Sequence, residues 1–263
     1  MNLGISGKRA LVVASSQGIG FAAAKVLAQE GARVVICSRS RERLDEAERE
    51  IFEDTGVRVG SYVVDLGVAG DISELANQIR RDYGGVDILV TNSGGPPALS
   101  FFEAEDEHWH QTVDTLLMST VRLIREFLPQ MVEQGWGRVI AVTSISCTQP
   151  HPDLLLSNSV RTSIHGLLKT LVSSHSKHGI TFNAVLPGYT LTQRTQELAT
   201  ARASRTGRSF QEVMEEMGKR APVGRCGDPM ETASMIAYLA SVQAGFVNGT
   251  SILVDGGESR GMF

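Results

Sequence analysis

The stretch from residue 10 to residue 20, ALVVASSQGIG, decides the fold. Its first five residues are apolar and predict a short buried β-strand at 10–14. An amphipathic segment at 21–30 predicts a helix soon after it. Gly18 and Gly20 therefore lie in a strand-to-helix turn, where the backbone N–H groups that begin a helix can approach a phosphate group. This position suits a dinucleotide site, although the two glycines alone would also suit a plain tight turn.

Outward from this unit, short apolar runs alternate with amphipathic stretches, as expected when helices connect parallel strands. The predicted strands are residues 10–14, 34–37, 57–63, 88–91, 139–143, 181–186 and 251–254. The predicted helices are residues 21–30, 41–53, 72–83, 109–133, 157–177 and 230–240. Because the strands are too apolar for either face to meet water, helices should cover both faces. The prediction is an α/β fold over residues 1–263: a single Rossmann-type domain with a doubly wound, parallel, seven-stranded sheet.

One segment, at 190–220, does not fit this alternation. It is polar, carries arginine and glutamate in mixture, and follows Pro187-Gly188. We expect it to form an inserted helical flap over the substrate. Its arginines indicate either an anionic group in the substrate or simply a solvated helix face: Arg194, Arg202, Arg205 and Arg208.

Composition and charge narrow the class of protein. With 263 residues, 42% of them hydrophobic and 21% charged, the chain resembles an ordinary globular domain. A formal net charge of -4 disfavours general binding to nucleic acid or anionic membranes, and the first residues lack a signal-peptide pattern. Cys37, Cys147 and Cys226 are too widely spaced for a disulfide framework or a zinc site. We expect a cytoplasmic protein that acts on a small molecule without a metal ion.

The end of the second predicted strand bears on which dinucleotide binds. An acidic residue about 20 positions after the glycine turn ordinarily takes the ribose 2′-hydroxyl of NAD. Residues 37–41 read CSRSR and contain no carboxylate. The guanidinium of Arg39 could instead bind a 2′-phosphate through two hydrogen bonds. The sequence therefore favours NADP(H), with NADPH preferred over NADH, although Arg39 could also be a solvated residue at the start of a charged helix.

Further landmarks follow in a fixed order along the chain. They are Asp65-Leu66 at the end of the third strand, TNSG at 91–94, GRVIAVTS at 137–144, Pro187-Gly188, and VDGG at 254–257. Together with the turn at 14–20, they resemble the short-chain dehydrogenase/reductase family over almost the whole chain. The resemblance is greatest to divergent members similar to 3-oxoacyl-acyl-carrier-protein reductases. Val13 and Ala14 depart from the family pattern, which has threonine and glycine at these positions.

The resemblance implies where the cofactor lies and how the chain assembles. Asp65-Leu66 would meet the adenine, and the Pro187-Gly188 turn would lie beside the nicotinamide. A homotetramer would form through the long helices that begin near Trp109 and Ser157. The residues expected to bind NADP(H) are Ser15, Ser16, Gln17, Gly18, Ile19, Gly20, Ser38, Arg39, Asp65, Leu66, Asn92, Ser93, Gly94, Pro187 and Gly188.

The active site departs further from the family. The family's catalytic residues are Asn, Ser, Tyr and Lys, and the lysine lies four residues after the tyrosine on the same face of a helix. In this chain Ser144 matches the serine, whereas Ser157 stands at the tyrosine position and Arg161 at the lysine position. Leu116 stands where the structural asparagine is expected. None of the tyrosines has a lysine four residues later: Tyr62, Tyr83, Tyr189 and Tyr238.

Ser144, Ser157 and Arg161 therefore form an atypical candidate catalytic set. A serine hydroxyl is a much weaker acid than a phenol, and arginine does not release its proton near neutral pH. We expect the three side chains to bind a substrate carbonyl or a developing oxyanion, while water or another acid supplies the proton. Ser157 and Arg161 could instead bind a cofactor hydroxyl or pair with a neighbour. His151 could act as an acid or base, or be an ordinary exposed loop histidine.

Three functions remain open from the sequence. The first is an oxidoreductase that transfers a hydride between NADP(H) and a carbonyl or alcohol. The second is a non-redox enzyme on the same fold, such as a lyase, an isomerase or a dehalogenase-like enzyme. The third is a catalytically silent dinucleotide-binding protein. The glycine turn, Arg39 and Asn92 favour a bound dinucleotide, whereas the missing tyrosine and lysine favour the second and third functions.

Overall fold

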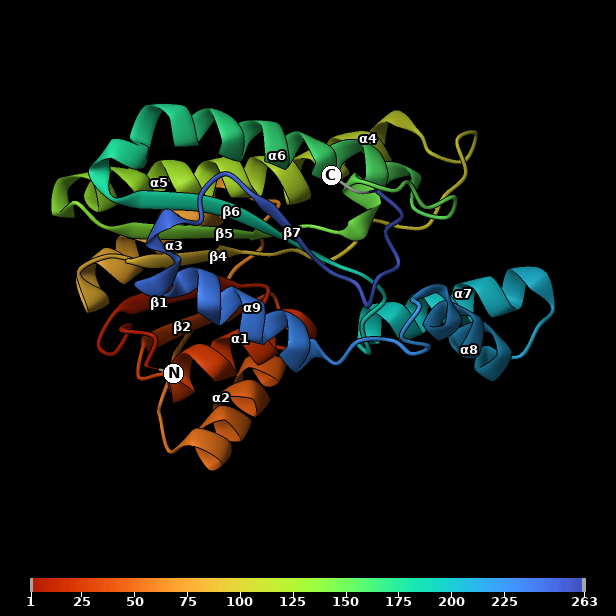
Figure 1. Ribbon diagram of the computed structural model, residues 1–263, viewed down its shortest axis with the longest axis horizontal. Helices are drawn as coiled ribbons and strands as arrows, with labels where there is room; N and C mark the ends of the chain where they lie inside the picture. The colour runs from red at the N-terminus through yellow and green to blue at the C-terminus, as the bar shows by residue number, and fades with distance from the viewer. Residues whose placement is uncertain (1, 262–263) are drawn as a thin grey trace.

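Seven parallel strands form one sheet in the order β3-β2-β1-β4-β5-β6-β7 (Figure 1). The computed structural model describes residues 2–261. The strands are β1 (Arg9–Val13), β2 (Arg33–Ser38), β3 (Gly60–Val63), β4 (Ile88–Thr91), β5 (Gly137–Val142), β6 (Ile180–Pro187) and β7 (Ser251–Val254). This sheet confirms the predicted doubly wound α/β fold, and most strand bounds differ from the prediction by only one or two residues.

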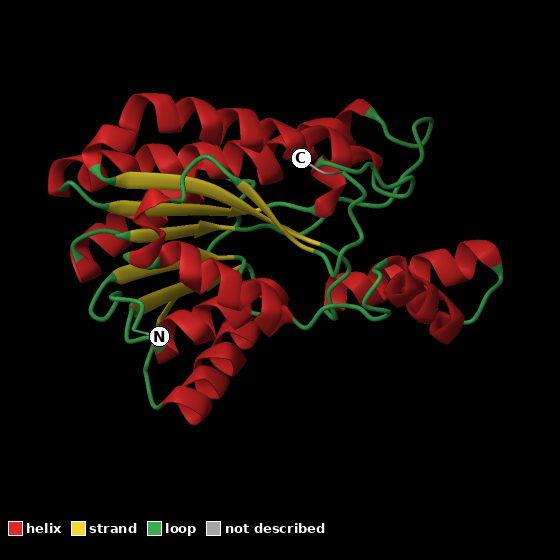
Figure 2. Ribbon diagram, viewed as in Figure 1, coloured by secondary structure: helices red, strands yellow, loops and turns green. Residues whose placement is uncertain are grey.

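Helices cover both faces of the sheet (Figures 1 and 2). They are α1 (Gly18–Gln29), α2 (Arg41–Thr55), α3 (Ala69–Tyr83), α4 (Asp106–Thr112), α5 (Ser119–Gln134), α6 (Leu155–His175), α7 (Gln193–Thr206), α8 (Phe210–Arg220) and α9 (Pro229–Ala240). α1, α2 and α9 pack on one face, and α3, α5 and α6 pack on the other.

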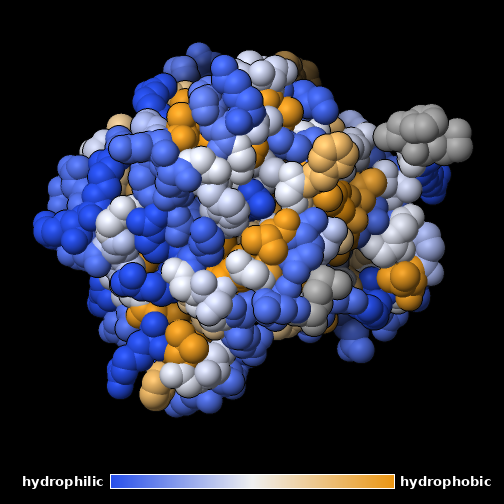
Figure 3. All heavy atoms as spheres, turned by 60° about the vertical axis from the view of Figure 1, so that its left-hand side comes forward, coloured by the Kyte–Doolittle hydropathy of each residue, from blue (hydrophilic) through white to orange (hydrophobic). Residues whose placement is uncertain are grey.

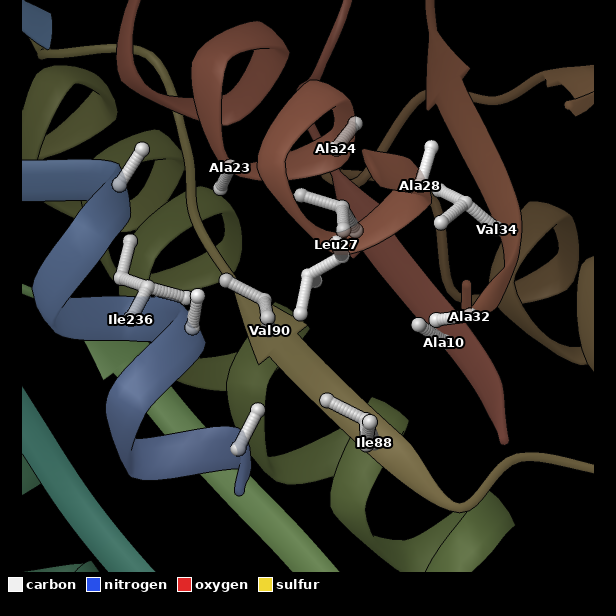
Figure 4. Close-up of a cluster of buried hydrophobic side chains, with 14 of the residues drawn as sticks. Ala10, Ala23, Ala24, Leu27, Ala28, Ala32, Val34, Ile88, Val90 and Ile236 are labelled. Atoms are coloured by element: carbon white, nitrogen blue, oxygen red, sulfur yellow. The ribbon is translucent and has the colours of Figure 1, made fainter. Parts of the chain in front are cut away.

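Two hydrophobic cores hold the three layers together. The first lies between the sheet and α1, α2 and α9, where Leu27, Val90 and Ile236 meet (Figure 4). The second lies on the opposite face and contains Phe127 and Phe182, the largest fully buried side chains among residues 2–261. Because successive strand residues point to opposite faces, the five inner strands β2, β1, β4, β5 and β6 each contribute to both cores. Burial on both faces is the reason that the strands read as continuous apolar runs.

The order of the strands reverses between β1 and β4. From β1 the chain builds outward through β2 to β3, and it then returns to place β4 on the other side of β1. The connections that leave the carboxyl ends of β1 and β4 therefore run in opposite directions and leave a crevice between them. The fold thus brings the turn after β1 and the loop after β4 to one place.

The helix predicted at 109–133 is interrupted in the structure. α4 and α5 are separated by a π-helical turn at Val113–Met118, which hydrophobic periodicity does not reveal. Such turns insert one extra residue into a helix and are frequent near functional sites. In this turn Leu116 is buried and Thr115 lines the cleft described below.

α7 and α8 form a helical hairpin, residues 193–220, called the hairpin below. It projects beyond the carboxyl ends of the strands (Figure 1). A small core of its own contains Ala199, Val213 and Met217. Ser209 and Glu212 form a capping box that fixes the start of α8. The hairpin therefore lies where the sequence predicts a helical flap.

On the face shown in Figure 3, hydrophilic residues prevail and hydrophobic ones form separate patches. None of the helices between residues 2 and 261 combines the length and hydropathy that a membrane span requires.

An ion pair links the start of β1 to the residue before β4, at the end of the sheet opposite the crevice. Asp87 is only 5% exposed and accepts hydrogen bonds from the backbone and guanidinium of Arg9 and from Gln134, at 2.6 to 2.9 Å. Burial raises the pKa of Asp87, but the hydrogen bonds and charge of Arg9 outweigh it and leave this pKa below its ordinary value. The folded state is therefore stabilised by the ionised carboxylate.

We expect Asp87→Asn to lower the free energy of unfolding by about 2–3 kcal/mol at pH 7, because it leaves Arg9 partly buried without its counter-charge. The difference between wild type and variant should be fully present above about pH 4 and shrink as pH falls through the lowered pKa. Urea unfolding between pH 3 and pH 7 measures this. A difference that stays constant over that range would contradict the assignment.

Candidate active site

A cleft of about 560 Å³ opens at the carboxyl ends of the strands. This volume lies within the range of about 300–1,000 Å³ that is usual for ligand sites. One end, called the nucleotide end, is lined by Ser38, Arg39 and Asp65. The other, called the substrate end, is lined by residues that follow β5, by the start of α6 and by the hairpin. The glycine turn and the loop after β4 lie along the cleft as well.

Most residues expected to bind a ligand line this cleft. Ser144, Ser157 and Arg161 all do so, at the substrate end. Of the residues expected at the cofactor, the cleft is lined by Ser16, Gln17, Gly18, Ile19, Ser38, Arg39, Asp65, Leu66, Asn92, Ser93, Gly94, Pro187 and Gly188.

Ser15 and Gly20, also expected at the cofactor, do not line the cleft. Ser15 is fully buried, and its hydroxyl donates to the carbonyl of Val12 (2.6 Å) and accepts from the amide of Cys37 (3.1 Å). A Cβ at Gly20 would collide with the carbonyl oxygen of Ala14. Both residues hold the turn against the sheet, so their side of the turn faces away from a ligand.

The glycine turn is held by the loop after β4. The Asn92 amide donates to the carbonyl of Ala14 (3.2 Å), on the far side of the crevice. Gly18 has φ +60°, a left-handed conformation that suits glycine, and begins α1. The first N–H groups of a helix have no partner within the helix and are free to bind an anion. The turn therefore has the form of a phosphate site.

Ala14 is the one non-glycine residue between residues 2 and 261 with a positive φ, +49°. The family has glycine at this position. The left-handed conformation costs alanine about 1–2 kcal/mol, and replacement by glycine removes this cost. Glycine also makes the unfolded chain more flexible, which offsets part of the gain in stability. We therefore expect Ala14→Gly to raise the free energy of unfolding by up to about 1 kcal/mol.

Thermal unfolding measures this effect, with Ala24→Gly as the matched control. Ala24 is buried inside α1, so glycine there should cost about 1 kcal/mol. If Ala14→Gly destabilises the protein as much as Ala24→Gly does, the strain assigned to Ala14 is absent.

The nucleotide end carries two cations. Arg39 is exposed at the end of β2 and makes no hydrogen bond or ion pair with residues 2–261. Arg43, one turn into α2, also lines the cleft and donates to the Gln17 side chain (3.3 Å). Among the described residues 2–261, Asp65 is the one acidic side chain that lines this end. Two guanidinium groups are thus available to an anionic ligand.

Arg161 lies at the substrate end, in a buried position. Its Nε donates to the Ser157 hydroxyl (3.1 Å), and its two Nη atoms donate to the carbonyls of Val142, Ser93 and Gly94 at 3.4–3.5 Å. A guanidinium has five N–H donors, so at least one remains after these four contacts. Burial, together with the charge of Arg194, lowers the pKa of Arg161 to about 10, which still leaves it charged at neutral pH. Arg161 therefore places a permanent positive charge beneath the cleft.

Two hydroxyl groups accompany this charge. The Ser144 oxygen accepts from the amide of Ser146 (3.1 Å), and the Ser157 oxygen accepts from Arg161. Neither hydroxyl donates a hydrogen bond to any residue between 2 and 261. Both hydroxyl groups can therefore still donate a hydrogen bond to a ligand oxygen.

A buried cluster of side chains completes the substrate end. His151 Nε2 lies 2.7 Å from the Tyr189 hydroxyl and also contacts Nη1 of Arg220. Burial and the charge of Arg220 lower the pKa of His151 to about 4, so the imidazole is neutral at pH 7. Burial raises the pKa of Tyr189 to about 12. His151 is thus a buried neutral acceptor and differs from an ordinary exposed loop histidine.

Several residues of the cleft are missing from the sequence-based set. They include Arg43, Thr115, Tyr189, Arg220 and Glu258. Tyr189 directly follows the Pro187-Gly188 turn, which is a signal that could have identified it. Arg220 and Glu258 carry no local signal, because only the fold brings the end of α8 and the segment after β7 to the cleft. No group of three or more His, Cys, Asp or Glu side chains suited to a metal occurs in residues 2–261.

Known proteins match this chain over nearly its whole length. A family model described as enoyl-(acyl carrier protein) reductase matches residues 13–259. The human protein dehydrogenase/reductase SDR family member 4 is 32% identical over 254 residues, covering 96% of this chain and 88% of that protein.

Solved structures also match this chain over nearly its whole length. L-sorbose reductase from Gluconobacter frateurii, complexed with NADPH and L-sorbose, is 33% identical with a TM-score of 0.94, and covers 100% of both chains. An actinorhodin polyketide ketoreductase with NADPH is 30% identical with a TM-score of 0.93, covering 97% of this chain and 98% of that one. The family model spans nearly the whole chain, and the two matched structures share its fold. The chain belongs to the short-chain dehydrogenase/reductase family of oxidoreductases.

Proposed function

We propose that this protein is an NADP(H)-dependent oxidoreductase that transfers a hydride between NADP(H) and a carbonyl or alcohol substrate. One observation carries the proposal: a single cleft joins a glycine turn suited to phosphates with the charged, hydroxyl-rich group of Ser144, Ser157 and Arg161. A binding protein would need only the first of these two parts.

The residues of the cleft fit a phosphorylated dinucleotide. The N–H groups at the start of α1 would hold the diphosphate, and Arg39 and Arg43 would bind the 2′-phosphate of NADP(H). Asp65 and Leu66 would lie along the adenine, and Asn92, Ser93 and Gly94 would lie along the other half of the molecule. The absence of a carboxylate at the end of β2 supports NADP(H) over NAD(H). NADPH in two matched structures supports the same choice.

The catalytic roles follow from the free donors at the substrate end. The nicotinamide supplies or accepts the hydride when bound. Ser144 and Ser157 donate hydrogen bonds to the carbonyl oxygen of the substrate, and the charge of Arg161 stabilises the negative charge that develops on it. Since neither serine nor arginine releases a proton readily at pH 7, a water that enters the cleft delivers the proton to this oxygen.

The chain works in this proposal as one domain, with the hairpin covering the substrate. We further propose a cytoplasmic homotetramer, as the family resemblance implies. The edge strand β7 supports an assembly, because Leu253 on it is 38% exposed and no strand formed by residues 2–261 lies beside its outer edge. Light scattering during gel filtration gives the assembly state directly.

Titration of the purified protein with NADPH and NADH tests the proposed function, followed by nicotinamide absorbance with ketones, ketoacids and acyl thioesters. The expected result is tighter binding of NADPH and its consumption with at least one carbonyl compound. Failure to bind either dinucleotide would overturn the proposal.

The alternative, a protein that binds the dinucleotide without turning it over, is favoured by the lack of a phenol–lysine pair on α6. It predicts tight NADPH binding with no consumption in any of these assays, and also no exchange of label between NADPH and a substrate.

A further inference from the structure

The hairpin supplies several arginines, but most of them have acidic partners. Arg202 contacts Glu216 at 2.6 Å, and Arg208 also pairs with Glu216. Arg205 pairs with Asp153. None of these three lines the cleft. Three of the four arginines that the sequence singles out are therefore paired with carboxylates outside the cleft.

Arg194 differs from these three. It lines the substrate end, and its closest acidic atom is Glu197 Oε2 at 3.8 Å, one turn along a largely exposed helix. Its Nη2 donates to the carbonyl of Pro96 (2.5 Å). A Cβ at Gly95 would lie 2.5 Å from Arg194 Nε, so the glycine leaves room for the guanidinium over the loop after β4. Arg194 is held in place by the loop and is only weakly neutralised.

Arg220 is the second hairpin arginine that lines the substrate end without a close carboxylate partner among residues 2–261. It ends α8, lines the substrate end and forms no ion pair within 4.0 Å among residues 2–261. Its Nη1 and the Tyr189 hydroxyl both lie within hydrogen-bonding distance of His151 Nε2. A neutral imidazole nitrogen accepts only one strong hydrogen bond. The guanidinium carbon lies 5.8 Å from the centre of the Tyr189 ring. Donors therefore outnumber acceptors around Arg220.

The charges of the substrate end do not balance. Arg161, Arg194 and Arg220 line it with three positive charges, and Glu258 is its one carboxylate in residues 2–261. Burial raises the pKa of Glu258, which weakens its ability to offset the arginines. A half-buried excess of positive charge and hydrogen-bond donors favours an anionic oxygen ligand.

We propose that Arg194 and Arg220 form an anion subsite, so that the substrate carries a carboxylate or phosphate beside the reacting carbonyl. The subsite rests on the proposed function, since it defines the substrate class of the same cleft. Arg161 and the serines hold the carbonyl, and the two hairpin arginines hold the anionic group. The hairpin thereby supplies the charges that select the substrate.

Matched pairs of compounds test this proposal: pyruvate, acetoacetate and levulinate against their methyl esters, and dihydroxyacetone phosphate against dihydroxyacetone. Titration calorimetry gives the Kd of each compound, and NADPH absorbance gives kcat/KM separately. The anionic member of at least one pair should bind wild type at least about tenfold more tightly than the neutral member. The carboxylate pairs and the phosphate pair show which anion the subsite takes.

Variants identify the arginines responsible. Arg194→Gln and Arg220→Gln should each weaken binding of the preferred anion about tenfold and leave the neutral member within about twofold. Arg220→Lys should retain part of the preference. Arg205→Gln removes the same charge from the hairpin outside the cleft and should change neither value. NADPH affinity and the melting temperature show whether each variant is folded.

Equal binding of anionic and neutral members by wild type would overturn the subsite, as would unchanged anion affinity in both Gln variants. Anion preference without NADPH consumption keeps the subsite and overturns the oxidoreductase. NADPH consumption without anion preference does the reverse.

Discussion

Replacing Arg161 with alanine is expected to lower kcat about 100- to 1000-fold, while the Kd for NADPH changes by less than about threefold. The reason is that, in the proposed mechanism, Arg161 supplies the charge beneath the carbonyl oxygen, and this charge matters most when the oxygen becomes an anion. Steady-state kinetics with the best carbonyl substrate, together with NADPH titration, measure the two quantities. The loss should fall on kcat more than on KM.

Two further variants separate catalysis from folding. Arg161→Lys keeps the charge with fewer donors and should recover part of the activity. Arg138→Ala removes another buried guanidinium, which lies in β5 and donates to the carbonyl of Ser241 (3.1 Å), away from the cleft. It should lower the melting temperature without a comparable loss of kcat. Equal losses of kcat in Arg161→Ala and Arg138→Ala, or none in the former, would rule out the catalytic role of Arg161.

Removal of the cations at the nucleotide end is expected to abolish the preference for NADPH. Arg39→Ala should weaken NADPH binding about 10-fold, and Arg39→Ala with Arg43→Ala about 100-fold, because in the proposed complex each guanidinium makes charge-assisted hydrogen bonds to the 2′-phosphate. Binding of NADH, which lacks this phosphate, should change by less than about twofold. The Kd of each dinucleotide, measured by fluorescence titration, gives the ratio.

The chain offers a close control for this experiment. Arg41 lies between the two cations in sequence but points to Ser61 (2.8 Å) and does not line the cleft. Arg41→Ala should leave both affinities unchanged. Since Arg39 and Arg43 are exposed, the NADPH preference of wild type should also decrease as ionic strength rises. If Arg39→Ala weakens NADPH and NADH binding by the same factor, Arg39 supports the glycine turn and does not bind the 2′-phosphate.

Part of the site was predictable because its residues sit at the ends of buried strands. Asn92, Ser144 and Pro187 follow apolar runs, and the carboxyl ends of parallel strands meet at one edge of a sheet. Ser15 shows the limit of this reasoning. It lies within the glycine turn in sequence, yet its hydroxyl joins β1 to β2 instead of facing the cleft. Which side of a turn a residue faces depends on backbone angles that composition does not reveal.

The sequence by itself determined the parallel sheet, its helical cover and the place of the glycine turn, because each of these follows from the periodicity or spacing of neighbouring residues. Only the tertiary structure decided which arginines are neutralised and which face the cleft. The contact between Arg220 and His151 spans 69 positions, and that between Arg194 and Pro96 spans 98. The charge of a site is a sum over such distant side chains, and the fold alone brings them within hydrogen-bonding distance.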